Sequence, residues 1–176
     1  MTVRKETWKP TLSDHEVQSY LFDEVGEEGL EMAEYLRDKA PITGVEILEH
    51  FAERKPSDVR KVLYRMMQAH AAEYEKDTDA AGWETFVWRL DLPEIGLILR
   101  RRWADELAHL RVQLKFEKDH QFYACSELHR RILFEDAMDI EFQCPTCQQA
   151  MQPIENADIV QALQERIDEL EPVFAT

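Results

Sequence analysis

The spacing of apolar residues along the chain predicts a protein built mainly from helices. Apolar side chains recur at intervals of three and four residues, which places them on one face of a helix. This pattern gives way to alternation of polar and apolar residues over 83–90, and it changes again after Lys118. The helices expected from the pattern cover about residues 14–25, 27–39, 44–53, 57–70, 93–118 and 157–171.

Residues that favour helix ends support these boundaries. A Ser or Thr followed three residues later by Glu has the spacing of a capping box, in which each residue's side chain binds the backbone N–H group of the other. Glycine is favoured just beyond a helix C-terminus because it adopts positive φ angles readily. The expected caps are Ser13 with Glu16, Thr43 with Glu46, Ser57 and Asn156 at N-termini, and Gly26 at a C-terminus.

The first half of the chain has the layout of a winged helix. The third and fourth expected helices are joined by only a few residues, as in a helix-turn-helix. The segments AAEYEK (71–76) and WETFVWRL (83–90) then predict two strands joined by DTDAAG. A strand hairpin directly after a helix-turn-helix corresponds to the wing. We expect a winged-helix domain over residues 1–92, with residues 1–12 as a polar arm.

Two groups of side chains in this domain are candidates for contact with a partner. The fourth helix directs Val59, Val62 or Leu63, Met66 and His70 inward, and its opposite face is polar. In the second strand, alternation separates Phe86 and Trp88 from Trp83, and the set that faces outward can stack on an unpaired base or fill a partner's pocket. For each group, an ordinary solvated face or core packing is the alternative. The contact candidates are Arg60, Lys61, Tyr64, Arg65, Trp83, Phe86 and Trp88.

A long connecting helix follows over residues 93–118. Pro93 suits a first helical position, and a stripe of leucines with Trp103 continues along the helix. At about 1.5 Å per residue such a helix spans roughly 39 Å, so it either connects two modules or pairs with another helix. Arg100, Arg101 and Arg102 form the strongest basic run of the chain, either an interaction patch or side chains that extend around a buried stripe.

Composition excludes several classes of protein. The 176 residues include 36 acidic and 21 Lys or Arg side chains, giving a net charge of −15 and arguing against a protein that coats duplex DNA with positive charge. With only 5 glycines and 7 prolines, a sandwich of many short strands is improbable. No stretch approaches the roughly 18 consecutive apolar residues of a membrane span. The charged N-terminus and odd cysteine count predict a cytoplasmic protein without disulfides.

All three cysteines lie in a short region, residues 119–153, for which we expect a zinc-ribbon-like module. Its strand-like pieces are FYAC, RRILF and EFQC, with a helical turn at 135–139, and Pro153 is expected to end the module. Cys144 and Cys147 form a C-x-x-C pair, and Cys125 lies upstream. A second pair would give a zinc site, but Leu128 stands where its other cysteine is expected. The proposed Zn²⁺ ligands are Cys125, His129, Cys144 and Cys147.

Three alternatives to this metal site remain. His120 is a less convenient fourth ligand than His129. The module can also fold without metal around apolar side chains such as Phe122 and Phe142, although a segment this short has a marginal core. The Cys-Pro-Thr-Cys string is also a thiol–disulfide motif, but it lacks the following helix and the preceding βαβ unit that lower a cysteine pKa in such enzymes.

Three strings in the order found here resemble archaeal transcription factor E, the counterpart of the large subunit of eukaryotic TFIIE. The strings are KPSDVRKVLYRM, GWETFVWRLDL and FEDAMDIEFQCPTC, within a resemblance that covers about residues 14–152. The sequence departs from the family pattern at Leu128, where the family usually has cysteine, and at Gln148, where it commonly has glycine. The resemblance does not extend to the acidic helix in residues 154–176.

The resemblance implies a general transcription initiation factor that binds RNA polymerase and stabilises the melted promoter. Its implied partners are the polymerase clamp, promoter DNA with TATA-binding protein and transcription factor B, and a second subunit of the same factor. We expect no catalytic residues, because the sequence has no phosphate-loop, dinucleotide-binding or serine-hydrolase motif. The competing hypotheses are a dimeric winged-helix regulator that binds a specific duplex sequence and, more remotely, a thiol oxidoreductase.

Overall fold

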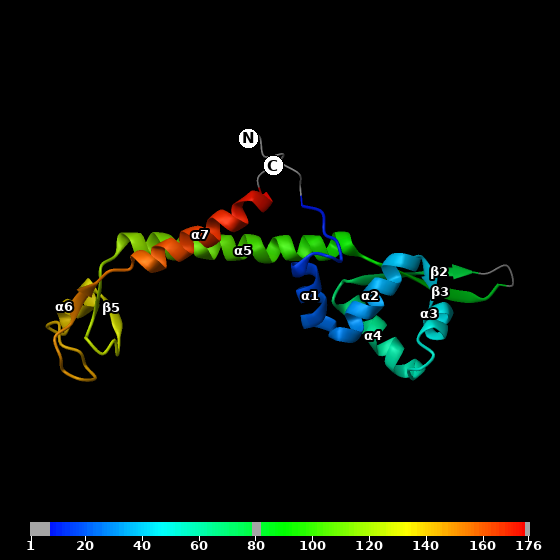
Figure 1. Ribbon diagram of the computed structural model, residues 1–176, viewed down its shortest axis with the longest axis horizontal. Helices are drawn as coiled ribbons and strands as arrows, with labels where there is room; N and C mark the ends of the chain where they lie inside the picture. Colours follow the sequence, from blue (N-terminus) through cyan, green and yellow to red (C-terminus); the bar gives the residue numbers. More distant parts are fainter. Residues whose placement is uncertain (1–7, 79–81, 175–176) are drawn as a thin grey trace. The chain divides into compact units, whose positions relative to one another are not determined.

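The computed structural model describes residues 8–78 and 82–174, so part of the expected arm (1–7) and of the wing turn (79–81) lies outside the described residues. The chain is mainly helical with two small antiparallel sheets, and it divides into a unit of residues 8–101 and a unit that begins at Arg102 (Figure 1). The helices are α1 (His15–Val25), α2 (Glu27–Lys39), α3 (Gly44–His50), α4 (Pro56–Gln68), α5 (Leu92–Asp119), α6 (Phe134–Asp139) and α7 (Ala157–Phe174). The strands are β1 (Ile42–Thr43), β2 (Ala72–Thr78), β3 (Glu84–Leu90), β4 (Phe122–Ala124), β5 (Arg131–Leu133) and β6 (Gln152–Ile154).

The unit of residues 8–101 has a core of helices beside a three-stranded sheet. Helices α1, α2 and α4 pack on one another, and the strand order is β1-β3-β2. The central strand β3 aligns Trp88 with Ile42 on one side and with Tyr74 on the other. The most buried side chains of this unit include Val17, Leu21, Met32, Leu36, Ile47, Phe51, Val59, Met66 and Ile95.

Local chemistry explains where three of its helices begin. The Thr43–Glu46 capping box is confirmed: Thr43 N–H donates to Glu46 Oε2 (2.9 Å), and Glu46 N–H donates to Thr43 Oγ1 (3.3 Å). The prediction that Ser13 caps α1 is wrong, because Asp14 holds the N-cap position and its carboxylate accepts from Thr11 N–H (2.8 Å). The prediction for Ser57 is also wrong, because Pro56 opens α4 with a φ angle already suited to a helix.

The helix ends are likewise set by backbone conformation. Gly26 ends α1 with φ 87°, as the sequence predicts. The inward face expected for α4 is confirmed for Val59, Val62, Leu63 and Met66, which are all buried. His70 does not belong to that face, because α4 ends at Gln68 and His70 turns away with φ 52° and an exposed side chain.

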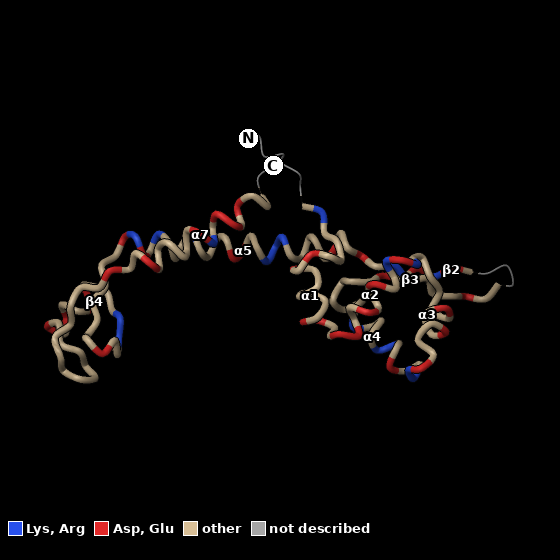
Figure 2. The backbone as a smooth tube through the Cα atoms, viewed as in Figure 1, with Lys and Arg blue, Asp and Glu red and all other residues tan. Residues whose placement is uncertain are grey.

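In the second unit, α7 packs along the C-terminal part of α5. Leu107 and Leu114 meet Ile167 and Leu170 in a buried seam, which Trp103 and Phe174 flank among other apolar residues. Ion pairs between Arg111 and Glu171 (2.7 Å) and between Arg166 and Glu106 (2.8 Å) border the seam. Helix α7 as a whole is acidic, with five Asp or Glu residues to one Arg, and Figure 2 shows these acids along it. The described helices include none that is long and apolar enough to cross a membrane.

The cysteine region forms a sheet of order β5-β4-β6. The expected helical turn is present as α6, but EFQC is not a strand, because Glu141 and Phe142 adopt φ angles of 51° and 56° that break an extended chain. The third strand is β6, where Pro153 pairs with Tyr123. Pro153 therefore lies within the sheet rather than after it, in an edge strand that tolerates a missing N–H group.

Glu117 fixes the end of α5 to this sheet and to the start of α7. Its carboxylate accepts hydrogen bonds from both Arg131 Nη atoms, one of them at 2.9 Å, and from Asn156 Nδ2 at 2.7 Å. Asn156 Nδ2 also donates to the backbone oxygen of Glu117 (2.8 Å). The Arg131 guanidinium, together with the Asn156 amide, holds the pKa of Glu117 below its usual range, although partial burial opposes the shift.

We expect Glu117→Gln to destabilise the second unit by about 1–3 kcal/mol at pH 7, since a charged hydrogen-bonded group is lost. Because the folded-state pKa of Glu117 is depressed, its contribution is present above the unfolded pKa of about 4.3 and is lost as pH falls through the folded pKa. The difference between wild type and variant should therefore shrink between pH 7 and about pH 3. Chemical unfolding at both pH values measures it, with exposed Glu155→Gln as the control. A difference independent of pH would contradict this assignment.

Candidate metal centre and contact surface

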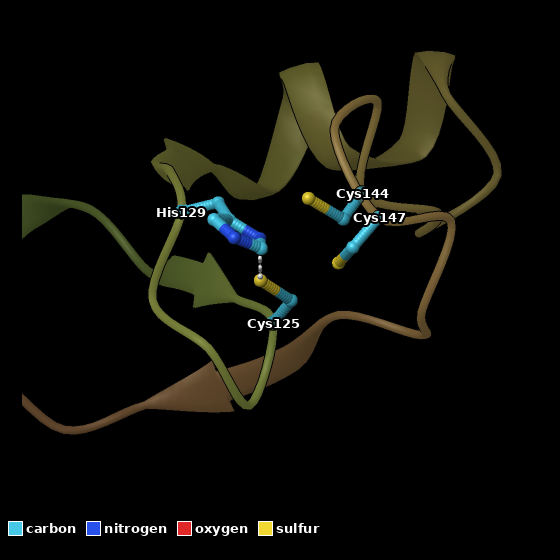
Figure 3. Close-up of side chains that lie close together, drawn as sticks. All are labelled: Cys125, His129, Cys144 and Cys147. Carbon is cyan, nitrogen blue, oxygen red and sulfur yellow. Dashed lines mark hydrogen bonds between the residues drawn. The ribbon is translucent and has the colours of Figure 1, made fainter.

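Four potential metal ligands come from two loops of the second unit. Cys125 directly follows β4, and a turn closed by Leu128 N–H to the Cys125 oxygen (2.9 Å) leads to His129. On the other side, Cys144 N–H donates to the Gln149 oxygen (2.9 Å) and Gln148 N–H to the Cys144 oxygen (2.7 Å). These bonds fold the chain into a tight knuckle that turns Cys144 and Cys147 toward Cys125 and His129 (Figure 3).

The distances between these side chains fit a tetrahedral zinc ion. The ligand atoms of Cys125, His129, Cys144 and Cys147 all lie within 4.8 Å of one another. Zn–S and Zn–N bonds of about 2.3 and 2.05 Å separate two ligands of a tetrahedron by about 3.8 Å for two sulfurs and about 3.6 Å for sulfur and nitrogen. Cys125 Sγ and His129 Nδ1 lie 3.6 Å apart (Figure 3). The donor set therefore suits zinc with little movement.

The cluster is closed on the cysteine side and open on the histidine side. Cys125 and Cys144 are buried together with Met151, and Tyr123 and Ile132 pack against them. Cys147 is half-buried, whereas His129 is exposed. Three sulfurs this close together can all be thiolates only when a cation balances their charge, so the arrangement fits a metal ion.

Backbone hydrogen bonds favour a thiolate at Cys144. The N–H groups of Cys147 and Thr146 point at its sulfur and lower the pKa of Cys144 to about 6, although burial opposes the shift. The pKa of Cys147 moves the other way: the Gln149 N–H lowers it, but burial and the neighbouring Cys144 and Cys125 raise it further. An N–H pair directed at a sulfur is an arrangement that prepares a thiolate for coordination.

The two departures from the family pattern have a backbone explanation. Leu128 stands at the expected cysteine position, but its φ of 51° turns the side chain outward, 71 % exposed, and brings the next residue, His129, into the cluster. Gln148 has φ 59°, a region that glycine occupies more easily. His120, the other candidate ligand, lies outside the cluster, and its Nδ1 atom approaches the Phe116 oxygen at 2.8 Å.

The basic candidates on α4 are mostly paired with acids. Lys61 lies 2.9 Å from Asp58, and Arg65 lies 3.0 Å from Glu28. Within the described chain, Arg60 makes no ion pair. It lines a groove together with Tyr64, Phe86 and Trp88. The structure thus brings four of the contact candidates to one groove, and it places Lys61 and Arg65 in a second groove together with Glu28 and Asp58.

The aromatic candidates divide between surface and core. Trp83 is 73 % exposed and Phe86 is 44 % exposed, whereas Trp88 is only 7 % exposed. Phe86 and Trp88 both contact Tyr74, with ring centroids 5.2 and 5.1 Å apart. Phe86 and Trp88 therefore share a face, as alternation predicts, but only Trp88 reaches the core.

Comparison with known proteins identifies the family. The family model described as the TFIIE alpha subunit matches residues 16–119, more than half of the chain. The chain belongs to this family. It is 34% identical over 154 residues to transcription factor E of Methanothrix thermoacetophila, a match that covers 87% of this chain and 91% of the relative. It is 32% identical over 163 residues to transcription factor E of Methanosarcina acetivorans, covering 92% and 96%.

The family match covers some of the described elements and not others. The matched residues 16–119 include α1 to α5, but not the four candidate metal ligands. The longer alignments with relatives named transcription factor E cover about nine-tenths of the chain. As a member of this family, the protein is a general transcription initiation factor.

Proposed function

We propose that this protein binds RNA polymerase at a promoter and stabilises the melted, open state of the complex. The observation that carries the proposal is the TFIIE alpha match over residues 16–119. Within that range, α3 and α4 are followed directly by the β2–β3 hairpin. We interpret this order as a winged helix with its wing, followed by a connecting helix and a zinc ribbon. The corresponding domain boundaries are 1–92, 93–118, 119–153 and 154–176.

Charge on the α4 face supports polymerase rather than free duplex DNA as the main partner. A helix that reads a major groove needs cations available for phosphates and base edges. Here Lys61 and Arg65 already pair with acids, and the whole chain has a net charge of −15. The partners we propose are the polymerase clamp and promoter DNA with TATA-binding protein and transcription factor B, together with a second subunit of the factor.

In this proposal Cys125, His129, Cys144 and Cys147 hold a structural zinc ion. Four protein ligands close a tetrahedral site, so the ion supplies a cross-link between two loops and no open position for a substrate. The chain from Cys144 to Met151 forms no helix, and in this respect its C-x-x-C pair differs from that of thiol oxidoreductases. The protein then acts without catalysis, by binding the open state of the complex more tightly than the closed state.

Permanganate footprinting tests the proposal on a promoter assembled with purified archaeal RNA polymerase, TATA-binding protein and transcription factor B. Adding the full chain should increase the reactivity of unpaired thymines, because preferential binding to the open state shifts the equilibrium toward it. The protein alone should not shift the naked duplex in a gel. Unchanged thymine reactivity together with tight binding to duplex DNA would refute the proposal and support an operator-binding regulator.

A further inference from the structure

A second groove lies in the unit of residues 8–101, where the N-terminal segment crosses the start of α5. It has a volume of about 410 Å³ and mostly apolar walls. None of the described residues that line it is acidic, although the chain carries 36 Asp and Glu residues. The lining consists of Trp8, Lys9, Pro10, Leu92, Pro93, Gly96, Leu97 and Arg100.

The walls of this groove are held by specific contacts. Gly96 lets the N-terminal segment approach the helix, since a Cβ atom there would lie 2.7 Å from Pro10 Cγ. Arg100 Nη2 donates a hydrogen bond to the backbone oxygen of Trp8, and its guanidinium carbon lies 5.9 Å from the centre of the Trp8 ring. These contacts hold the N-terminal segment against α5, so specific interactions fix both walls of the groove.

The charges around the groove favour an anionic partner. Arg100 Nε is buried and has no hydrogen-bond partner in the part of the chain that the structure describes. Lys9 and Arg101 are exposed, and neither has an ion-pair partner among the described residues. A guanidinium that is shielded from water and incompletely hydrogen-bonded is stabilised by a nearby anion. This contrasts with α4, where Lys61 and Arg65 already have acidic partners.

The apolar walls indicate a protein rather than a phosphate backbone as the occupant. Leu97, which is 46 % exposed, and Pro93, which is also exposed, both line the groove. Burying this apolar surface would therefore stabilise a bound protein segment, in addition to any attraction between charges. We propose that this groove binds an acidic segment of RNA polymerase and that an apolar side chain of that segment packs on Leu97. This inference rests on the proposed function, because polymerase is the partner named there.

Binding of the full chain to purified archaeal RNA polymerase tests the proposal by fluorescence anisotropy. Leu97→Glu places a negative charge among the apolar contacts and should weaken binding about tenfold. Lys9→Glu changes an exposed side chain that packs little and should weaken binding in the same direction, mainly through slower association. Val112→Glu is the matched control, since Val112 lies on the same helix, is 68 % exposed and is not part of the groove.

The outcomes separate this inference from the function on which it rests. Weaker polymerase binding by Leu97→Glu and Lys9→Glu, with Val112→Glu equal to wild type, supports the groove as the docking site. Equal polymerase binding by all three variants and the wild type overturns the proposal that the groove is the docking site, but leaves the proposed function standing. If both groove variants retain their affinity for polymerase but reduce thymine reactivity in the promoter complex, the occupant is nucleic acid and the proposal is wrong. Wild-type protein that does not bind polymerase overturns both proposals.

Discussion

Replacing Cys144 by serine should remove zinc from the protein and unfold the loops around the cysteine cluster. Cys144 is fully buried, and its sulfur accepts hydrogen bonds from the N–H groups of Cys147 and Thr146. Water therefore cannot replace the Cys144 sulfur as a ligand while the knuckle stays folded. Structural zinc supplies much of the folding free energy of a module this small. We expect about one zinc per chain in the wild type and almost none in Cys144→Ser after dialysis against a mild chelator.

Metal analysis and hydrogen exchange together check this result. Zinc content gives occupancy, and exchange of the β4, β5 and β6 amides should accelerate in the variant without change in α1 to α4. Ser126→Ala is the control: Ser126 adjoins a ligand and bonds Gln149 Oε1 (2.6 Å) but offers no ligand atom to the cluster. His129→Ala should have an intermediate effect, since the exposed histidine position is accessible to water. Full zinc content and normal amide protection in Cys144→Ser would show that this residue is not a ligand.

Much of this cluster could be predicted from sequence because its chemistry is local. The C-x-x-C pair fixes Cys144 and Cys147 within one turn, and Cys125 and His129 are close enough in sequence to share a second turn. The sequence could not show why residue 129, rather than residue 128, supplies the ligand. That depends on the left-handed backbone of Leu128, a conformation that leucine rarely adopts and that its residue type does not indicate.

The helices could be predicted for the same reason, whereas contacts between distant segments could not. The capping box at Thr43 involves residues three apart and was visible in the sequence. The pairing of Arg65 with Glu28 joins residues 37 apart, and nothing in the pattern of either helix indicates it. The same holds for the third ribbon strand, since pairing with β4 is what makes residues 152–154 extended. Tertiary packing decides these features, and it also decides which aromatic side chains of β3 are buried.

Trp88→Ala should destabilise the unit of residues 8–101 by about 3–5 kcal/mol, which is the usual cost of truncating a large buried aromatic side chain. Trp88 is aligned with Ile42 and Tyr74 on the neighbouring strands and contacts the Tyr74 ring, and its indole nitrogen lies 3.6 Å from where a Cβ atom on Gly44 would be. Trp83→Ala should change stability by no more than about 0.5 kcal/mol, because Trp83 is 73 % exposed. Hydrogen exchange of the β2 and β3 amides in the full chain measures both effects within this unit.

These two tryptophans also separate a structural role from a contact role in initiation. If Trp83 stacks on an unpaired base or fills a polymerase pocket, Trp83→Ala should reduce thymine reactivity in the permanganate assay while amide protection stays normal, with a loss of about 1–3 kcal/mol per stacked base. Trp88→Ala should reduce thymine reactivity only at temperatures at which the unit of residues 8–101 has begun to unfold, so its effect should increase with temperature. Equal losses of amide protection in both variants would contradict the division between core and surface. Because alternation along β3 fixes only which residues share a face, exposure rather than residue type decides which aromatic side chain is available to a partner.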